Sequence, residues 1–274
     1  MAASSTVEAV DLAAAMVVGR AGPADWLLIA PVLLPLAAAA VLLMLRRHTT
    51  LQAGGALLAL LLNTLSIALL LARVWQEGPL TMMMGRWLPP FGIAFTADMT
   101  GTLLALAGWL VGRACTFYAI SDIDGPRRHH GFYPLLLLMI AGVDGAFLTG
   151  DLFNLYVWFE VLLIASFGLI VLGSERAQLD GAVKYAFLNL IGTTLFLISV
   201  GYVYGAFGTL NMADIAMKAR QPEIAAPIGT IAGLLALSFA AKAAAFPVNF
   251  WLPASYHTPR IVVSALFAGL LTKV

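Results

Sequence analysis

The sequence predicts an all-α, polytopic membrane protein, and three features of its composition and pattern agree on this. Hydrophobic residues make up 61% of the 274 residues and charged residues only 11%, and the mean hydropathy is +0.94. These values lie far from those of soluble domains. Apolar stretches of about 20 residues, enough to cross ~30 Å of hydrocarbon, recur between short turns rich in Gly, Pro and Asp. The lipid bilayer is therefore the first expected partner.

Seven complete transmembrane helices are expected, followed by a truncated eighth. The seven expected spans are 26–45, 51–74, 98–120, 132–149, 152–172, 182–206 and 226–246. The eighth begins near Arg260 and is cut off at Val274. Because a native membrane protein seldom stops within a helix, the chain is expected to be the front part of a longer protein. Residues 1–25 lack the basic start and clean apolar core of a signal peptide, and are interpreted as an exposed lead-in.

Positive charges in the short loops predict the orientation of the chain in the membrane. Arg46 and Arg47 follow the first expected span, and Arg127 and Arg128 follow the third. Lys and Arg favour the cytoplasmic side of short loops. The bias places the odd-numbered loops inside and the N-terminus outside.

The seventh span is expected to be broken. The segment 227–257 is too long for one straight crossing and contains Pro247 and Pro253, with Lys242 near its middle. Proline inside a helix removes a backbone hydrogen bond and costs ~3 kcal/mol or more. Broken helices at membrane depth occur where the freed backbone faces protein or a water-filled cavity. Lys242 is therefore placed for solvation and ion handling.

Four ionisable side chains lie within these apolar stretches: Glu160, Lys184, Lys242 and Lys273. A charge at the centre of a membrane helix costs at least ~2.5–3.5 kcal/mol, so such residues usually pair, line a wet cavity or carry ions. Glu160 lies 8 residues into its span, or ~12 Å along the helix axis. Lys273 lies 12 residues past Ile261, or ~18 Å along it. Both depths are close to the bilayer midplane, which favours a proton path.

Glu160 and Lys242 are the strongest candidates for this path. Burial alone favours the neutral form of each group, whereas an opposite charge nearby favours the ionised form. We expect the two side chains to face each other across a polar cavity, within direct or one-water reach, so that one proton switches the pair. Two structural alternatives stay open: a neutral Glu160 bonded between helices, and a Lys242 that binds carbonyls freed by the helix break.

The remaining candidates have weaker or alternative interpretations. Lys184, 2 residues inside its span, either joins the path or extends to the interface. Lys273 belongs to the path unless it simply meets water at the chain end, and His257 has the chemistry to relay protons. Asp151 is expected to cap the helix that follows it. Asp144 either lies in an ion entrance or is a buried carboxyl group whose hydrogen bonds are satisfied within the protein.

Other classes of site have no support in the sequence. The single cysteine, Cys115, excludes an intrachain disulfide framework and a cysteine metal cluster. The chain contains no Gly-rich phosphate loop, no HExxH motif and no His or Cys metal spacing. The net charge of +1 gives no case for a nucleic-acid partner. No cofactor and no metal are therefore expected.

Three stretches resemble a known family. Residues 132–160, FYPLLLLMIAGVDGAFLTGDLFNLYVWFE, and 161–216, beginning VLLIASFGLIVLGSERAQLDG, resemble the D-type subunit of the multisubunit Na⁺/H⁺ antiporter (Mrp type). Residues 240–274, AAKAAAFPVNFWLPASYHTPRIVVSALFAGLLTKV, resemble the broken helix and following lysine helix in the antiporter-like subunits of respiratory complex I. The resemblance covers roughly residues 95–274.

The resemblance implies a 14-helix fold with two inverted repeats, of which this chain would hold only the first. It implies that Glu160 is the acid of the fifth helix, paired with Lys242 on the seventh. It also implies that Lys184 and Lys273 are the lysines of the sixth and eighth helices. The expected organisation is a lead-in at 1–25, the first three transmembrane helices at 26–120, and a proton-antiporter-like domain at 121–274.

The expected function is a membrane subunit of a multisubunit monovalent cation (Na⁺)/proton antiporter in the bacterial plasma membrane. Its expected partners are the other antiporter subunits of a hetero-oligomer, and it would handle protons and Na⁺. Two alternatives stay open. The chain could be a proton-pumping subunit of NADH:quinone oxidoreductase (complex I) or of a membrane hydrogenase, hence part of an enzyme, or it could be a non-transporting fragment.

Overall fold

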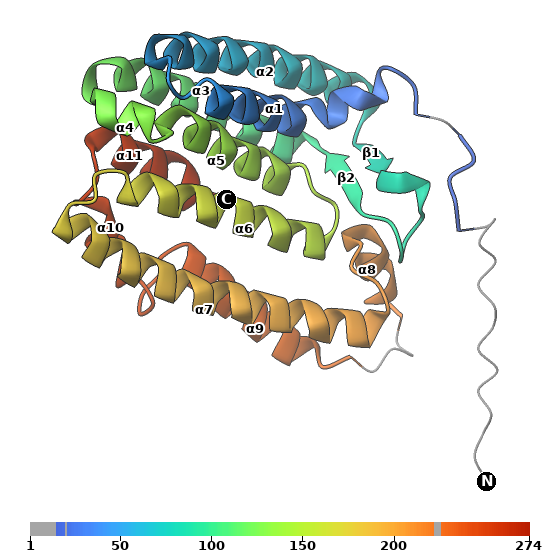
Figure 1. Cartoon of the computed structure of the whole chain (residues 1–274). Helices are drawn as coiled ribbons and strands as arrows, with labels where there is room; N and C mark the ends of the chain where they lie inside the picture. The colour runs from blue at the N-terminus through green and yellow to red at the C-terminus, as the bar shows by residue number, and fades with distance from the viewer. Residues whose placement is uncertain (1–14, 20, 222–225) are drawn as a thin grey trace.

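The computed structural model describes residues 15–19, 21–221 and 226–274, so most of the expected lead-in lies outside the described residues. Figure 1 shows a bundle of helices with a small hairpin at one end. The elements are η1 (Asp25–Leu28), α1 (Ala30–Met44), α2 (Thr49–Glu77), β1 (Leu80–Met83), η2 (Met84–Arg86), β2 (Ala94–Ala97), α3 (Met99–Asp122), α4 (Gly125–His129), α5 (Phe132–Phe147), α6 (Leu152–Val171), α7 (Arg176–Phe207), α8 (Met212–Lys218), α9 (Ile228–Lys242), α10 (Trp251–Tyr256), α11 (Ile261–Leu266) and η3 (Phe267–Leu271).

Four helices of the described chain are long and apolar enough to cross a membrane, namely α2, α3, α6 and α7. The apolar helices α1, α5 and α9, and the stretch 261–271, are shorter. Each of the seven expected spans overlaps one of these helices. The bounds agree within four residues, except that α7 begins at Arg176, six residues before the expected start. Because three of the seven fall short of a full crossing, the count of seven complete spans stays a prediction.

Side chains at the helix starts explain where several helices begin. The Asp98 carboxylate accepts a hydrogen bond from the Gly101 N–H at 2.6 Å at the start of α3. At the start of α7, Glu175 and Gln178 form a reciprocal capping box. Such caps satisfy N–H groups that have no partner inside the helix, and each is typically worth ~1 kcal/mol.

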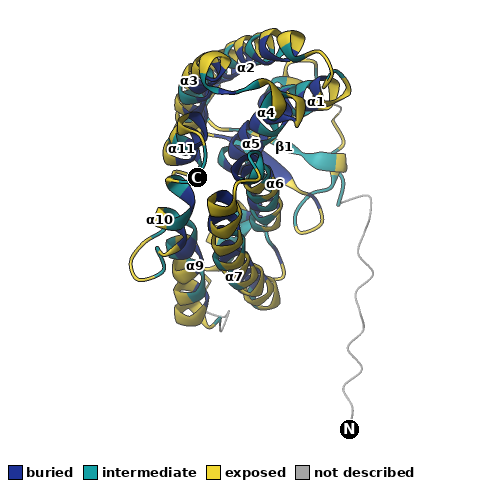
Figure 2. Cartoon of the chain, turned by 60° about the vertical axis from the view of Figure 1, so that its left-hand side comes forward, coloured by how far each residue is buried: buried dark blue, intermediate teal, exposed yellow. Residues whose placement is uncertain are grey.

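Helix α5 is the centre of the bundle, with 13 of its 16 residues buried. It packs against α1, α3 and α6, and Figure 2 colours it mostly as buried. Glycine permits the closest approach of α6: a Cβ at Gly145 would lie 2.2 Å from the Trp158 ring. A Cβ at Gly142 would lie 3.0 Å from the backbone nitrogen of Leu162.

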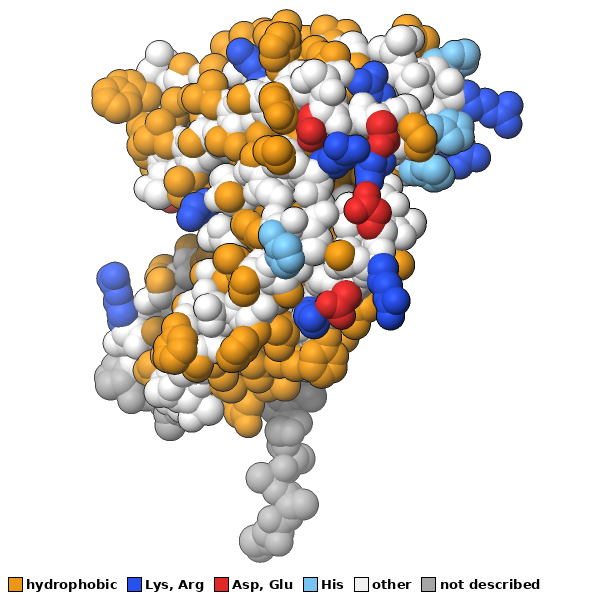
Figure 3. Space-filling model, turned by 90° about the vertical axis from the view of Figure 1, so that its left-hand side faces the viewer, with side chains coloured by type: hydrophobic (Ala, Val, Ile, Leu, Met, Phe, Trp, Pro, Cys, Tyr) orange, Lys and Arg blue, Asp and Glu red, His pale blue; other side chains and the backbone are white. Residues whose placement is uncertain are grey.

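Helices α7 and α9 pack against each other and form a separate layer (Figure 1). Large apolar side chains on α7, such as Val183, Phe187 and Leu190, are exposed. Figure 3 shows many further apolar side chains on one face of the molecule. Such continuous apolar surface is what lipid or neighbouring membrane helices cover.

The connection between α2 and α3 adds a small sheet to the mostly helical fold, which was not predicted from the sequence. Strands β1 and β2 form a two-stranded antiparallel sheet that pairs Leu80 with Ala97 and Met83 with Ala94. Isolated β-bridges pair Phe95 with Thr149 and Asp151 with Asn211. They connect the small sheet to the starts of α6 and α8. The strands are only 4 residues long, too short for a clear alternating pattern in the sequence.

Candidate functional site

The helical path is interrupted directly after Lys242, which is the last residue of α9. Ala244 has a left-handed backbone (φ +54°), and helix resumes only at Trp251, the start of α10. The Trp251 Nε1–H donates to the carbonyl of Ala241 at 2.9 Å and fixes α10 to the end of α9. The last carbonyls of a helix carry partial negative charge, which favours a cation such as Lys242 at this position.

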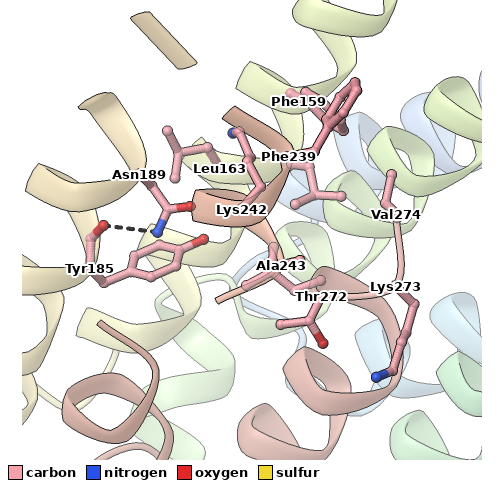
Figure 4. A pocket seen from close by; sticks show the side chains of 12 residues that line it. Phe159, Leu163, Tyr185, Asn189, Phe239, Lys242, Ala243, Thr272, Lys273 and Val274 are labelled. Carbon is pink, nitrogen blue, oxygen red and sulfur yellow. Dashed lines mark hydrogen bonds between the residues drawn. The ribbon is translucent and has the colours of Figure 1, made fainter. Parts of the chain in front are cut away.

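The side chain of Lys242 lines a cavity of about 260 Å³. The cavity lies between α6, α7, α9 and the end of the chain, and Figure 4 shows its wall. A water molecule occupies about 30 Å³ of liquid, so the cavity has room for several. Its lining residues are Phe159, Leu162, Leu163, Tyr185, Asn189, Phe239, Lys242, Ala243, Leu271, Thr272, Lys273 and Val274.

The ammonium group of Lys242 faces an aromatic ring. Its Nζ atom lies 4.9 Å from the centroid of the Phe159 ring, within the range of a cation–π interaction. The ring is buried and is held edge-on by Phe196, with the centroids 5.6 Å apart, and by Phe239, at 6.4 Å. This cluster joins α6, α7 and α9 around the lysine.

The opposite wall of the cavity is polar and belongs to α7. The Asn189 Nδ2–H donates to the carbonyl of Tyr185 at 3.0 Å (Figure 4). The Tyr185 hydroxyl lies 2.5 Å from Ser166 Oγ on α6. The Ser238 hydroxyl donates to the carbonyl of Gly192 at 2.8 Å and holds α9 against α7. Of these side chains, Tyr185 and Asn189 line the cavity and can orient water beside the lysine.

Glu160 forms no direct ion pair with Lys242, so of the two expected arrangements, direct or one-water reach, only the water-bridged one stays a prediction. The two side chains form no ion pair within 4.0 Å in the described part of the chain. Glu160 follows Phe159 on α6, and successive residues of a helix point about 100° apart. The ring therefore occupies the face of α6 that meets Lys242, and Glu160 lies half-buried beside it.

The other predicted lysines and the histidine lie in different settings. Lys273 lines the cavity, but its side chain is exposed, and its ammonium points away from that of Lys242 in Figure 4. Lys184 forms an ion pair with Asp180 at 2.6 Å on an exposed turn of α7. The ring of His257 bonds to the carbonyl of Pro253 and is exposed at the end of α10.

Asp144 and Asp151 differ sharply in their surroundings. The Asp151 carboxylate accepts a hydrogen bond from the Asn154 N–H at 2.9 Å and caps α6. Asp144 has no exposed surface and accepts hydrogen bonds from Trp109 at 2.7 and 2.9 Å and from Asn63 at 3.2 Å. Neither residue lines the cavity beside Lys242.

Residues without charge supply much of the site, and they were not among the residues predicted from the sequence. Phe159, Tyr185, Asn189 and Trp251 surround or position Lys242. A signal existed for Asn189, because an amide inside an apolar span needs a partner. Aromatic side chains carry no such signal, since they are frequent in any buried helix. In the described ranges, no three His, Cys, Asp or Glu side chains are grouped to hold a metal ion.

Comparison with known proteins places the chain in a family. Residues 149–274 match the family model described as NADH:quinone oxidoreductase/Mrp antiporter, TM. The D-type subunit of the Na⁺/H⁺ antiporter of Alkalihalophilus pseudofirmus is 46% identical over 201 residues, which are 73% of this chain and 41% of that protein. This chain belongs to the same family of antiporter subunits. As a family member with several long apolar helices, it is a multi-pass protein of the bacterial plasma membrane.

Solved structures of the family show the same arrangement of helices. A chain of the Mrp complex from Dietzia sp. DQ12-45-1b has a TM-score of 0.83 and 29% identity, and the match covers 92% of this chain and 47% of that one. A chain of the membrane-bound sulfane sulfur reductase, an archaeal respiratory membrane complex, has a TM-score of 0.82 and 29% identity, with 91% and 51% covered. The chain spans about half the length of the curated relatives it matches.

Proposed function

We propose that this chain contributes a proton half-channel to a multisubunit monovalent cation (Na⁺)/proton antiporter, in which it assembles with the other antiporter subunits. The observation that carries the proposal is the position of Lys242, at a helix interruption and in the wall of a cavity with room for water. Relatives named as D-type subunits of Na⁺/H⁺ antiporters support the cation/proton exchange.

In this proposal Lys242 is the group that gains and loses the proton. Its charged form is stabilised by the carbonyl end of α9 and by the Phe159 ring, and its neutral form by removal from bulk water. Because these effects oppose each other, a small change around the amine moves the proton. Glu160 does not itself line the cavity. In this proposal it is the acid that exchanges a proton with Lys242 through water between them.

Lys273, Lys184 and His257 are proposed to continue the path away from Lys242. Lys273 lines the same cavity and is the next group along this route. Lys184 and His257 are exposed and would exchange protons with water at the membrane surface. Asp151 is proposed to keep the start of α6 fixed, which sets the depth of Glu160. The proposal also includes seven complete transmembrane spans, the seventh of them broken.

The decisive experiment measures exchange in everted vesicles from a host that lacks its own Na⁺/H⁺ antiporters. The gene is expressed together with its neighbouring antiporter genes, and Na⁺ addition is followed by dequenching of a pH-sensitive dye. Lys242→Ala should abolish the response. Lys218→Ala, which changes a lysine of the short helix α8, is the matched control and should leave it intact. Full exchange by the Lys242 variant would refute the proposal.

A second function is favoured by one specific observation. The match to a chain of an archaeal respiratory membrane complex is as good in fold as the match to the Mrp complex. A redox-driven pump would acidify everted vesicles when an electron donor such as NADH is supplied and would not respond to Na⁺ alone. The same vesicles therefore separate the two functions, and vesicles silent in both assays would support a non-transporting fragment.

A further inference from the structure

A second ionisable group is buried outside the lysine cavity, where α1, α2, α3 and α5 meet. The Asp144 carboxyl group has no exposed surface. The Trp109 Nε1 atom lies 2.7 Å from its Oδ2 and 2.9 Å from its Oδ1. The Asn63 Nδ2 atom lies 3.2 Å from Oδ2. The cavity beside Lys242 is lined from α6, α7, α9 and the chain end, so the two groups occupy different parts of the bundle.

The orientation of the Asn63 amide is fixed by a proline. Pro35 lies inside α1 and has no N–H, so the carbonyl of Pro31 lacks its usual helical donor. The Asn63 Nδ2–H takes the place of that donor at 2.9 Å. The Ser66 hydroxyl bonds the amide oxygen of Asn63 at 3.2 Å. The NH₂ group of Asn63 is therefore turned towards Asp144, and the Asp144 carboxyl group must accept a hydrogen bond from it.

No positive charge balances Asp144 in the described part of the chain. The charged side chains on the helices packed around α5 are Arg73, Glu77, Arg113, Asp122, Arg127, Arg128 and Glu160. None of them forms an ion pair with Asp144 within 4.0 Å; Arg73 is paired with Glu77, and Arg127 with Asp124 and Glu175. Helix α1 carries no charged residue.

We infer that Asp144 is a proton-binding site that holds its proton as a neutral carboxylic acid in the folded protein. An unpaired carboxylate in a buried membrane segment is far more costly than a neutral acid that is hydrogen-bonded. Oδ2 accepts from both Trp109 and Asn63 and is the carbonyl oxygen. Oδ1 has only the longer Trp109 contact and carries the proton.

The proton on Asp144 is linked to the packing of α1. Loss of the proton would leave a negative charge that draws the Asn63 amide away from the Pro31 carbonyl, which would then lose its donor. A carboxyl group that changes between these two states thus couples proton binding to the packing of α1 on α2 and α5. The coupling does not pass through Lys242 and does not depend on the proposed function.

The test is infrared spectroscopy of the protein in lipid, with ¹³C in the aspartate carboxyl groups. At neutral pH the wild type should show an isotope-shifted C=O stretch of a protonated carboxylic acid. Asp144→Asn should remove this band, and Asp151→Asn, which changes another buried aspartate, should retain it. Absence of the band in the wild type, or its persistence in Asp144→Asn, would overturn the assignment.

A second variant keeps the test decisive if Asp144→Asn does not fold. Trp109→Phe retains the acid and removes the indole N–H that bonds it. Weaker hydrogen bonding to Oδ2 should raise the frequency of the C=O stretch in this variant. An unmoved band would show that it arises from a different aspartate.

Discussion

The ammonium group of Lys242 lies over the ring of Phe159, 4.9 Å from its centroid, and not against the carboxylate of the next residue on α6. An aromatic face stabilises a cation without supplying a full negative charge or accepting its proton. Lys242 therefore keeps the freedom to lose its proton that a tight ion pair would remove.

Phe159→Leu should destabilise the protein and alter the environment of Lys242. Leucine fills part of the volume but has no ring face, so the variant should lose ~0.5–2 kcal/mol of cation–π interaction and its aromatic contacts with Phe196 and Phe239. Thermal unfolding in detergent measures the loss. Phe153→Leu, on the exposed side of α6, is the control and should have a much smaller effect. Equal shifts in the two variants would contradict this role of the ring.

The lack of a direct ion pair between Glu160 and Lys242 leads to a second prediction, on the coupling free energy between the two residues. Removing one partner of a buried, contacting pair costs ~3–5 kcal/mol, and contacting groups couple by ~0.5–3 kcal/mol. Because Glu160 and Lys242 are not in contact, the coupling in a Glu160→Gln, Lys242→Ala double-mutant cycle should lie at or below ~0.5 kcal/mol. Unfolding free energies of the four proteins give the value. A coupling of several kcal/mol would mean that the two groups meet directly in the membrane.

The helices of the bundle could be predicted from the sequence, because a span of apolar residues between Gly and Pro turns has few other solutions in a bilayer. Lys242 and Asp151 could also be selected from the sequence, since a charge beside a proline-rich break and an Asp before an apolar run each imply a local role. The side chains that contact them could not be predicted. Which neighbour meets Lys242 depends on the rotation of α6 about its axis, and one residue of difference selects Phe159 over Glu160.

The proline inside α1 gives a third prediction, which uses a compensating pair. Asn63→Leu removes the donor to the Pro31 carbonyl and one donor to Asp144, so it should cost ~1–3 kcal/mol for each buried group left unpaired. Adding Pro35→Ala supplies a backbone N–H four residues after Pro31. The double variant should therefore regain part of the lost stability, as measured by thermal unfolding. No recovery would show that the Pro31 carbonyl is satisfied in another way.

A fourth prediction concerns acid stability at the loop between α3 and α4. The Arg127 N–H, aided by the guanidinium groups of Arg127 and Arg260, holds the pKa of Asp124 below its ordinary value, against the opposing effect of burial. A lowered folded-state pKa gives stability that is complete above the unfolded pKa and is lost as the pH falls through the folded pKa. Asp124→Asn should flatten the fall of melting temperature in acid, whereas Asp180→Asn, in an exposed pair, should not. An unchanged acid slope in Asp124→Asn would contradict the assignment.

The fifth prediction tests the orientation of the chain, which the arginine distribution places with the loop of α4 in the cytoplasm. Arg127 is a poor reporter position because its side chain is only 11% exposed and bonds Asp124 and Glu175. His129, at the end of α4, is exposed. In a Cys115→Ala background, which removes the single native thiol, His129→Cys should resist a membrane-impermeant maleimide in intact cells.

Two further measurements make the labelling result decisive about the membrane side of α4. The cysteine at position 129 should react in everted vesicles, where the cytoplasmic side faces the reagent. The converse control is Phe91→Cys, in the exposed connection between β1 and β2, which should react in intact cells. Labelling of position 129 from outside, with position 91 protected, would invert the topology and place Asp124 and the α4 arginines on the outer surface.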